Sequence, residues 1–126
     1  MQHPLTETKQ RLISRRKPLT ARVGVFGVGH YTYWSQFEGL LGEMHRKLGH
    51  LEGRVRGFGV EVVNFGMVDT AKAAYALRDQ LRAARLDLIF CDMVTYATSA
   101  TFGILIRDLD VPIVLVALQP LAALDY

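Results

Sequence analysis

The sequence predicts an α/β domain in which a parallel sheet is covered by helices on both faces. Three observations lead to this class: four short apolar segments recur along the chain, amphipathic segments of helical length separate them, and half of the 126 residues are hydrophobic. A chain of this size has enough apolar material for one hydrophobic core, and a second complete domain does not fit. We therefore expect a single doubly wound, flavodoxin- or Rossmann-like domain.

The first half of the chain supplies two strands and one helix of this pattern. Ala21–Gly27 (ARVGVFG) is β-branched and apolar and stops at a glycine, which predicts a buried first strand. An amphipathic helix is expected from Ser35, a suitable N-cap residue, to Arg56. Val60–Phe65 (VEVVNF) predicts the second strand. The apolar residues of the helix recur at three- and four-residue spacing: Phe37, Leu40, Leu41, Met44, Leu48 and Leu51.

The second half repeats the alternation. A helix is expected to begin at Asp69, and Asp87–Cys91 (DLIFC) predicts the third strand. Ser99–Leu109 predicts a third helix with a weaker pattern, and Val111–Ala117 (VPIVLVA) predicts the fourth strand. Four strands thus alternate with three helices.

The connections limit the topology of the sheet. Right-handed crossovers leave few arrangements, of which we expect the order 2-1-3-4. Sheets of this class usually have five or more strands, so we expect a truncated fold whose fourth strand is an apolar edge. Pro112 is the only residue there that opposes pairing with another strand, and self-association is therefore expected.

Charge divides the chain into two parts. Residues 1–22 contain six Lys or Arg residues and one Glu, whereas the remainder has nine basic and eleven acidic residues. We interpret residues 1–20 as a flexible basic arm and residues 21–126 as the α/β domain. A basic arm without a basic folded surface argues against a nucleic-acid partner. The longest apolar run, Val111–Leu118, is too short to cross a membrane, and the amino terminus has no apolar signal-peptide core.

The ionisable residues do not form a catalytic set. Cys91 is the only cysteine, which favours a reducing, cytoplasmic setting, and it is interpreted as an inert core residue rather than a nucleophile with His30 as its base. Asp92 follows it where a receiver domain has its phosphate acceptor. The carboxylates that would hold Mg²⁺ are absent from the end of the first strand, so Asp92 is expected to hydrogen-bond to the loop that follows it. No group of residues has metal-ligand spacing.

Four loops are expected to meet where ligands bind in open α/β sheets, beyond the carboxyl ends of the strands. They are Val28–Trp34, Gly66–Asp69, Asp92–Tyr96 and Gln119–Pro120. Two alternatives are open for the aromatic residues of the first loop: they stack on a sugar ring or fill an interface, or they pack on the helix that follows.

A nicotinamide site is not expected in the first loop. Gly27 and Gly29 occupy the first positions of a dinucleotide fingerprint, but Thr32 stands at the third glycine. The second strand ends in Asn64 and Phe65, without the acid that would bind a ribose.

Four segments, taken in order, resemble the amino-terminal domain of the L-arabinose/L-fucose isomerase family, and most closely its arabinose-isomerase-like members. The resemblance covers Arg22 to Tyr126, and Gly27 and His30 match a Gly-x-x-His loop after the first strand. The segments are VGVFGVGHYTYWSQFEGLL, GVEVVNFGMVDT, DLIFCDMVTYATSATFG and VPIVLVALQPL.

This resemblance implies a part in ketose–aldose isomerisation that is not catalytic alone. The family holds a divalent metal, commonly Mn²⁺, with glutamates and histidines of later domains, so no cofactor and no metal ligand is expected here. Its first loop contacts the sugar substrate in a neighbouring subunit of a homo-oligomer, a role that falls on His30, Tyr31 and Gly29. Tyr33 and Trp34 are added because aromatic planes suit sugar faces. The alternative is a stand-alone small-molecule-binding or assembly module of the same fold.

Overall fold

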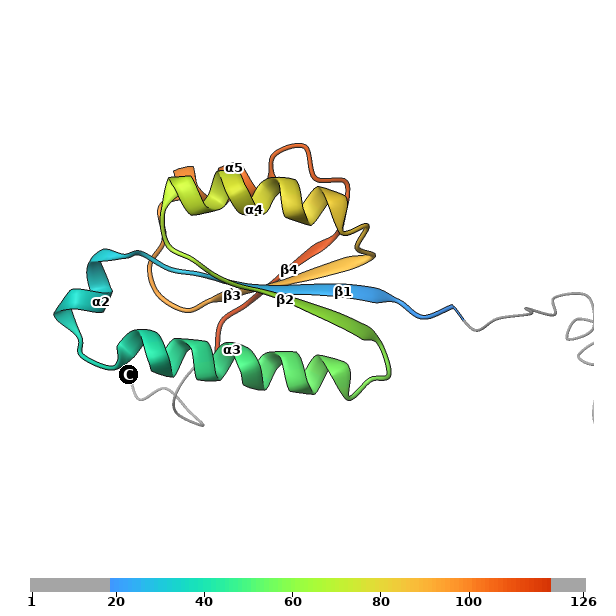
Figure 1. Ribbon diagram of the computed structural model, residues 1–126, viewed down its shortest axis with the longest axis horizontal. Coiled ribbons are helices and arrows are strands. Elements are labelled where there is room, and N and C mark those ends of the chain that lie inside the picture. Colours follow the sequence, from blue (N-terminus) through green and yellow to red (C-terminus); the bar gives the residue numbers. More distant parts are fainter. Residues whose placement is uncertain (1–18, 119–126) are drawn as a thin grey trace, which may run out of the picture.

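The computed structural model describes residues 19–118, which form a four-stranded sheet between two layers of helices (Figure 1). The predicted arm over residues 1–20 lies outside the described residues except for Leu19 and Thr20, and so does the predicted loop Gln119–Pro120. The elements in chain order are β1 (Arg22–Val28), α2 (Thr32–Gln36), α3 (Leu40–Arg56), β2 (Glu61–Val68), α4 (Ala71–Ala83), β3 (Leu88–Met93), α5 (Ser99–Ile106) and β4 (Ile113–Val116).

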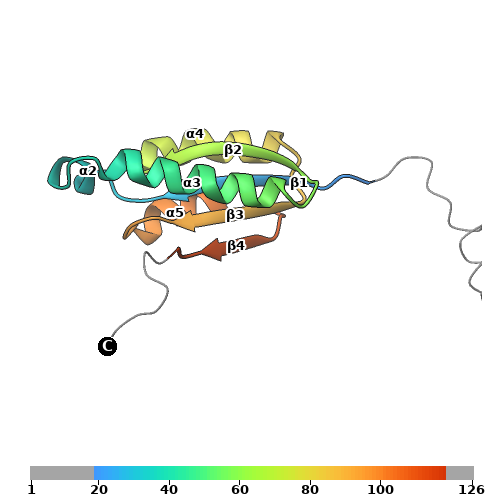
Figure 2. The ribbon, with the colours of Figure 1, turned by 90° about the horizontal axis from the view of Figure 1, so that it is seen from below.

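The sheet has the expected topology. Its strands are all parallel in the order β2-β1-β3-β4, which confirms the predicted α/β class and strand order. α3 lies on one face of the sheet, and α4 and α5 lie on the other (Figure 1). β2 and β4 form the two edges, with β4 on the side away from α3 and α4 (Figure 2). None of the helices within residues 19–118 has the length and hydropathy needed to cross a membrane.

The core of the domain lies between the sheet and the α4–α5 layer. Phe26 and Ile89 of the two central strands pack in one buried cluster with Leu81 of α4 and Leu105 of α5. Burying aliphatic and aromatic side chains of this size contributes about 1.5–3 kcal/mol each. This cluster therefore fixes the central strands against α4 and α5.

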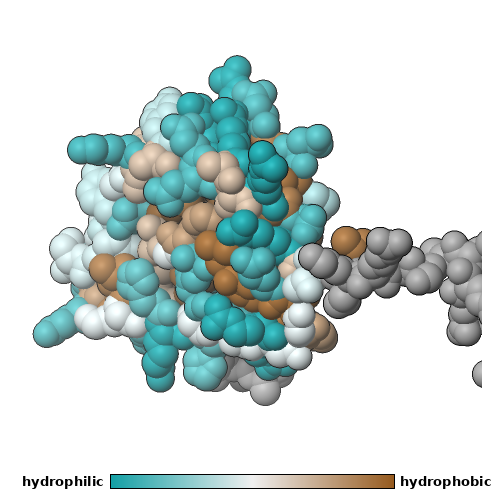
Figure 3. All heavy atoms as spheres, turned by 45° about the vertical axis from the view of Figure 1, so that its right-hand side comes forward, coloured by the Kyte–Doolittle hydropathy of each residue, from teal (hydrophilic) through white to brown (hydrophobic). Residues whose placement is uncertain are grey.

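The α3 face is less completely covered. Figure 3, in which the amino-terminal ends of the strands come forward, shows hydrophobic surface between more hydrophilic regions. A hollow of about 190 Å³ lies at this end, beside the carboxyl-terminal part of α3. Its lining is entirely apolar: Val23, Val55, Phe58, Val60, Leu88 and Phe90.

The single helix predicted from Ser35 to Arg56 is wrong at its start. Ser35 lies inside the short helix α2, and α3 begins at Leu40. Gly39 separates the two helices with a φ of +78°, a left-handed conformation that interrupts right-handed helix and favours glycine.

Two other predicted helix ends are also corrected. Asp69 does not begin the second helix, because Thr70 is the N-cap of α4 and its hydroxyl accepts the N–H of Ala73 (3.1 Å). The third helix starts at Ser99 as predicted but ends at Ile106 instead of Leu109. The helix ends because Arg107 has extended backbone and Asp108 is left-handed (φ +62°).

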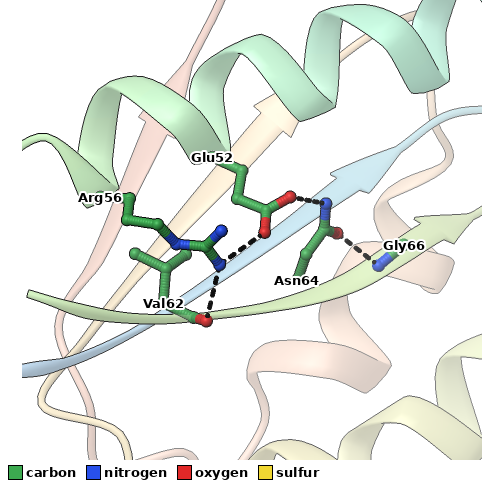
Figure 4. Close-up of polar contacts among 5 residues, drawn as sticks. All are labelled: Glu52, Arg56, Val62, Asn64 and Gly66. Atoms are coloured by element: carbon green, nitrogen blue, oxygen red, sulfur yellow. Dashed lines mark hydrogen bonds and ion pairs between the residues drawn. The ribbon is translucent and has the colours of Figure 1, made fainter.

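One irregularity interrupts the ladder between β1 and β2. Val25 and Gly27 of β1 pair with Asn64 and Met67 of β2, so β2 has one extra residue in this interval. Gly66 takes a φ of +81°, and its N–H donates to Oδ1 of Asn64 (2.9 Å; Figure 4). An extra residue on one strand is a β-bulge, and this one lets β2 extend to Val68, three residues beyond its predicted end.

A polar network joins α3 to the outer edge of β2 (Figure 4). Glu52 of α3 accepts a hydrogen bond from the Asn64 amide (2.9 Å) and pairs with Arg56 (2.8 Å). Arg56 also donates to the backbone carbonyl of Val62 (3.4 Å), which points away from β1. The β2 edge is thus occupied by charged side chains from its neighbouring helix.

Candidate functional site

Three loops meet at the carboxyl edge of the sheet, and backbone hydrogen bonds connect them. The N–H of Gly29, after β1, donates to the carbonyl of Val68 at the end of β2 (2.9 Å). On the other side, the N–H of Val94, after β3, donates to the carbonyl of Val28 (3.2 Å). The loop after β1 is therefore held between its two neighbours, as the topology predicts.

Two side chains fix the direction of this loop. Oγ1 of Thr95 accepts the backbone N–H of His30 (3.2 Å), and the carboxylate of Asp69 accepts the indole N–H of Trp34 (2.7 Å). Hydrogen bonds to an ionised acceptor are shorter and stronger than neutral ones. Sequence reasoning missed the anchoring role of Thr95 and Asp69, and neither residue stands in a motif that would reveal it.

Gly29 packs closely between two side chains that take part in the anchoring hydrogen bonds, Thr95 and Trp34. A Cβ atom at this position would lie 2.9 Å from Oγ1 of Thr95 and 3.1 Å from the ring of Trp34. Only a residue without a side chain lets the loop pass between these groups. Gly29 is therefore a positioning residue for the loop, and its contact with substrate stays a prediction.

His30 and Tyr31 form a stacked pair at the start of the loop. Their ring centroids are 5.0 Å apart, with an angle of 20° between the planes. Nδ1 of His30 accepts the backbone N–H of Thr32 (3.3 Å) and lies 2.7 Å from its hydroxyl oxygen. This arrangement places the ring proton of neutral His30 on Nε2, where it is available as a donor.

The remaining aromatic residues point in different directions. Tyr33 meets the edge of the His30 ring at 6.3 Å and lies 6.4 Å from the ring of Phe37, in the connection to α3. Trp34 is held against Asp69. Tyr31 is 56% exposed, the most open of the four predicted aromatic residues. Tyr33 and Trp34 are thus packed locally, Tyr31 is exposed, and contact of these residues with a sugar or an interface stays a prediction.

A second feature of this edge is an apolar pocket beside the amino terminus of α5. Its volume is about 210 Å³, smaller than the 300–1,000 Å³ of typical small-molecule sites. The hydroxyl groups of Thr98 and Ser99 are its only side-chain polar groups. The other lining residues come from three strands or their loops and from α5: Val28, Met93, Ala97, Phe102 and Leu115.

Asp92 lies at the same edge but in a different environment. It is buried in β3, opposite Gly27 of β1 and Val116 of β4, and its Oδ2 has no hydrogen-bond partner within the described residues. The expected hydrogen bond to the following loop is therefore wrong. Burial raises the pKa of the Asp92 carboxyl above its ordinary value, and the positive charge of Lys47 on α3 opposes this rise.

The raised pKa of Asp92 has a consequence for stability. The folded protein binds this proton more tightly than the unfolded chain, so the group stabilises the fold below its unfolded pKa, near 4. This contribution is lost as the pH rises through the folded pKa. We expect Asp92→Asn to increase the free energy of unfolding at pH 7 by about 1–3 kcal/mol, with a smaller increase at pH 4, measured by urea denaturation.

The matched control for this prediction is Asp79→Asn, at an exposed carboxylate on α4. This variant should retain the pH dependence of the parent protein. An equal slope of stability against pH in Asp92→Asn and the parent would contradict the assigned role of the buried carboxyl.

Cys91 belongs to the hydrophobic core. It is fully buried in the cluster under α4 and α5, and burial followed by the charge of Asp92 raises the pKa of its thiol to about 12. A thiol that stays protonated is a poor nucleophile, which supports the prediction of an inert core residue.

Fold and site together define a parallel α/β domain with an anchored aromatic loop at the carboxyl edge of its sheet. Residues 19–118 contain no cluster of three or more His, Cys, Asp or Glu side chains able to hold a metal ion. Comparison with known proteins found no matching family model, no matching curated protein and no matching solved structure.

Proposed function

We propose that this chain is the amino-terminal substrate-loop and oligomerisation domain of a metal-dependent ketose–aldose isomerase, similar to the L-arabinose/L-fucose isomerases. One observation carries the proposal: the stacked His30–Tyr31 pair, with Tyr31 exposed, lies on a loop that hydrogen bonds to Thr95 and Asp69 anchor. Anchoring on one side and exposure on the other suit a loop that completes a site outside its own domain. In this role the domain is not catalytic alone.

Both side chains of the stacked pair have a chemistry that suits a sugar. The face of Tyr31 offers an apolar plane for the C–H groups of a pyranose or furanose ring. Nε2 of His30 can donate to a sugar hydroxyl, because Nδ1 is already occupied by Thr32. The described residues do not fit a divalent metal, so the proton transfers and the polarisation of substrate oxygens are assigned to other parts of the enzyme.

Sugar titration of the full chain, followed by NMR, tests this proposal. L-arabinose and L-fucose should shift the resonances of His30 and Tyr31 with affinity in the millimolar range, since the loop forms only part of a site. Tyr31→Ala should weaken this binding by about tenfold, which corresponds to about 1.4 kcal/mol.

The control is Tyr75→Ala, because Tyr75 on α4 is exposed to the same extent as Tyr31, 53% against 56%. It should bind sugar like the parent chain. Equal affinities for the parent chain and Tyr31→Ala, or no shift in the loop at saturating sugar, would overturn the proposal.

A second candidate function is a stand-alone small-molecule-binding module. The apolar pocket beside α5 favours it, because it lies at the carboxyl edge of β1, β3 and β4, where this fold class takes ligands. The same titration separates the two functions. A ligand of the module would shift Phe102 and Thr98 in the pocket and leave Tyr31 unchanged.

A further inference from the structure

Within residues 19–118, the outward backbone groups of β4 have no hydrogen-bond partner. β4 is the last strand in the order β2-β1-β3-β4 of the described residues. The N–H of Ile89 donates to the carbonyl of Pro112 (3.0 Å), which sets the phase of the β3–β4 ladder. Since alternate residues of a strand face the same neighbour, Val114 bonds to β3, whereas Ile113 and Leu115 direct their N–H and C=O groups outward.

This edge differs from the opposite one in its protection. At β2, Arg56 covers an outward carbonyl and Glu52 holds the guanidinium in place (Figure 4). β4 is Ile-Val-Leu-Val, without charge, bulge or proline inside the strand. Folded proteins usually protect an exposed edge strand by one of these devices. β4 is short but has none of these three devices, so its outward groups are open to pairing with another strand.

The side chains around β4 are also those of an interface. Val114 is 42% and Leu115 is 52% exposed, and they lie on opposite faces of the sheet. α5 (SATFGILI) has no charged residue and no polar face, whereas α3 and α4 each carry several charges. A helix that is apolar on all sides is typically enclosed by protein.

We propose that the β4 edge pairs with the β4 edge of a second copy of this chain. The two strands run antiparallel about a two-fold axis perpendicular to the sheet, and the two four-stranded sheets join into one. The symmetry follows from the strand itself: Leu115 is the central outward-facing residue between Ile113 and Ala117. A two-fold interface requires this kind of self-complementary surface.

The axis at Leu115 fixes the contacts. Leu115 lies opposite Leu115 of the second copy in a hydrogen-bonded pair, so each N–H donates to the carbonyl of the other. Ile113 lies opposite Ala117 with the same geometry, and on the α3 face Val114 lies beside Val116. The uncharged α5 helices face each other across the axis, which leaves no charge buried at the contact. The pairing uses no residue of the His30–Tyr31 loop, so it stands or falls independently of the proposed sugar contact.

Sedimentation equilibrium of the full chain tests this proposal. The expected species has twice the 14.1 kDa mass of one chain and dissociates on dilution. Leu115→Pro removes only an outward N–H, which leaves the bonds to β3 in place. It should raise the dissociation constant of the dimer at least about tenfold with unchanged far-UV circular dichroism. A dimer of unchanged affinity in this variant would overturn the proposal.

A charge-pairing experiment tests the register and does not depend on the tolerance of proline. Leu115→Lys and Leu115→Glu should each be monomeric, because like charges then meet at the axis. An equimolar mixture of the two variants should form a one-to-one dimer. Failure of the mixture to associate would exclude pairing of Leu115 with itself.

Hydrogen exchange separates pairing with a second copy from coverage by another part of the same chain. The amides of Ile113 and Leu115 should be protected at high protein concentration and exchange rapidly on dilution. Protection that is independent of concentration in a monomeric protein would assign the edge to residues 119–126 and overturn the proposal.

Discussion

Replacement of Phe26 by alanine is expected to lower the free energy of unfolding by about 3–5 kcal/mol. Phe26 is 1% exposed and lies in a central strand, inside the cluster that joins the sheet to α4 and α5. Removing its ring leaves a cavity that the close-packed neighbours cannot fill. For a domain with a total stability of roughly 5–15 kcal/mol, this loss unfolds a large fraction of the molecules on mild heating.

Urea denaturation followed by circular dichroism measures the effect, and Phe58→Ala is its control. Phe58 is 85% exposed, so the same change in chemistry should alter stability by less than about 0.5 kcal/mol. Equal losses in the two variants would contradict the position of the core between the sheet and the α4–α5 layer.

Gly29→Ala is the second substitution with a large expected effect. The new methyl group would lie 2.9 Å from Oγ1 of Thr95 and 3.1 Å from the ring of Trp34, so one of these groups must move. Movement of Thr95 breaks its bond to the N–H of His30, and movement of the indole weakens its bond to Asp69. We expect a loss of about 1–3 kcal/mol in stability and a displaced loop.

The chain reports this displacement itself, because Trp34 is its only tryptophan. Its fluorescence emission should shift to longer wavelength in Gly29→Ala as the indole becomes more exposed. Gly49→Ala is the matched control: a Cβ there has open space in α3, and alanine should stabilise the helix by up to about 1 kcal/mol. The change in the free energy of unfolding should therefore be negative for Gly29→Ala and positive for Gly49→Ala. A gain in stability in Gly29→Ala would contradict the close packing of Gly29 against Thr95 and Trp34.

Much of the fold follows from the sequence because its signals are local. Apolar runs such as Asp87–Cys91 and their alternation with helices predict a parallel sheet, and the handedness of crossovers predicts its order. The break at Gly39 escapes this reasoning. Phe37 and Leu40 continue the three-residue spacing across it, although Phe37 lies exposed between two helices. Periodicity depends only on which residues are apolar, so it does not predict the left-handed conformation of Gly39.

The candidate site is predictable only in outline. Topology places the His30–Trp34 loop at the carboxyl edge, since parallel strands all end there. The bonds that orient it join residues far apart in sequence, 35 positions for Trp34 and Asp69 and 65 for His30 and Thr95. The prediction for Asp92 is wrong because the sequence does not show that its carboxyl is buried. An aspartate at the end of a strand looks the same in the sequence whether its carboxyl points to the following loop or into the interior.

The bulge at Gly66 shifts the alternation of the β2 side chains by one residue. Before it, Phe65 faces the core; after it, Met67 turns toward α3, and Val68 returns to the core instead of pointing away from it. If β2 ran through Gly66 with regular alternation and no bulge, Val68 would face α3 and the direction of Asp69 would be reversed as well. The position of the Asp69 carboxylate beside Trp34 thus depends on a glycine of β2 with a positive φ. A side chain at Gly66 would be strained at this positive φ, and we expect it to disturb the partner of the indole together with the β1–β2 ladder.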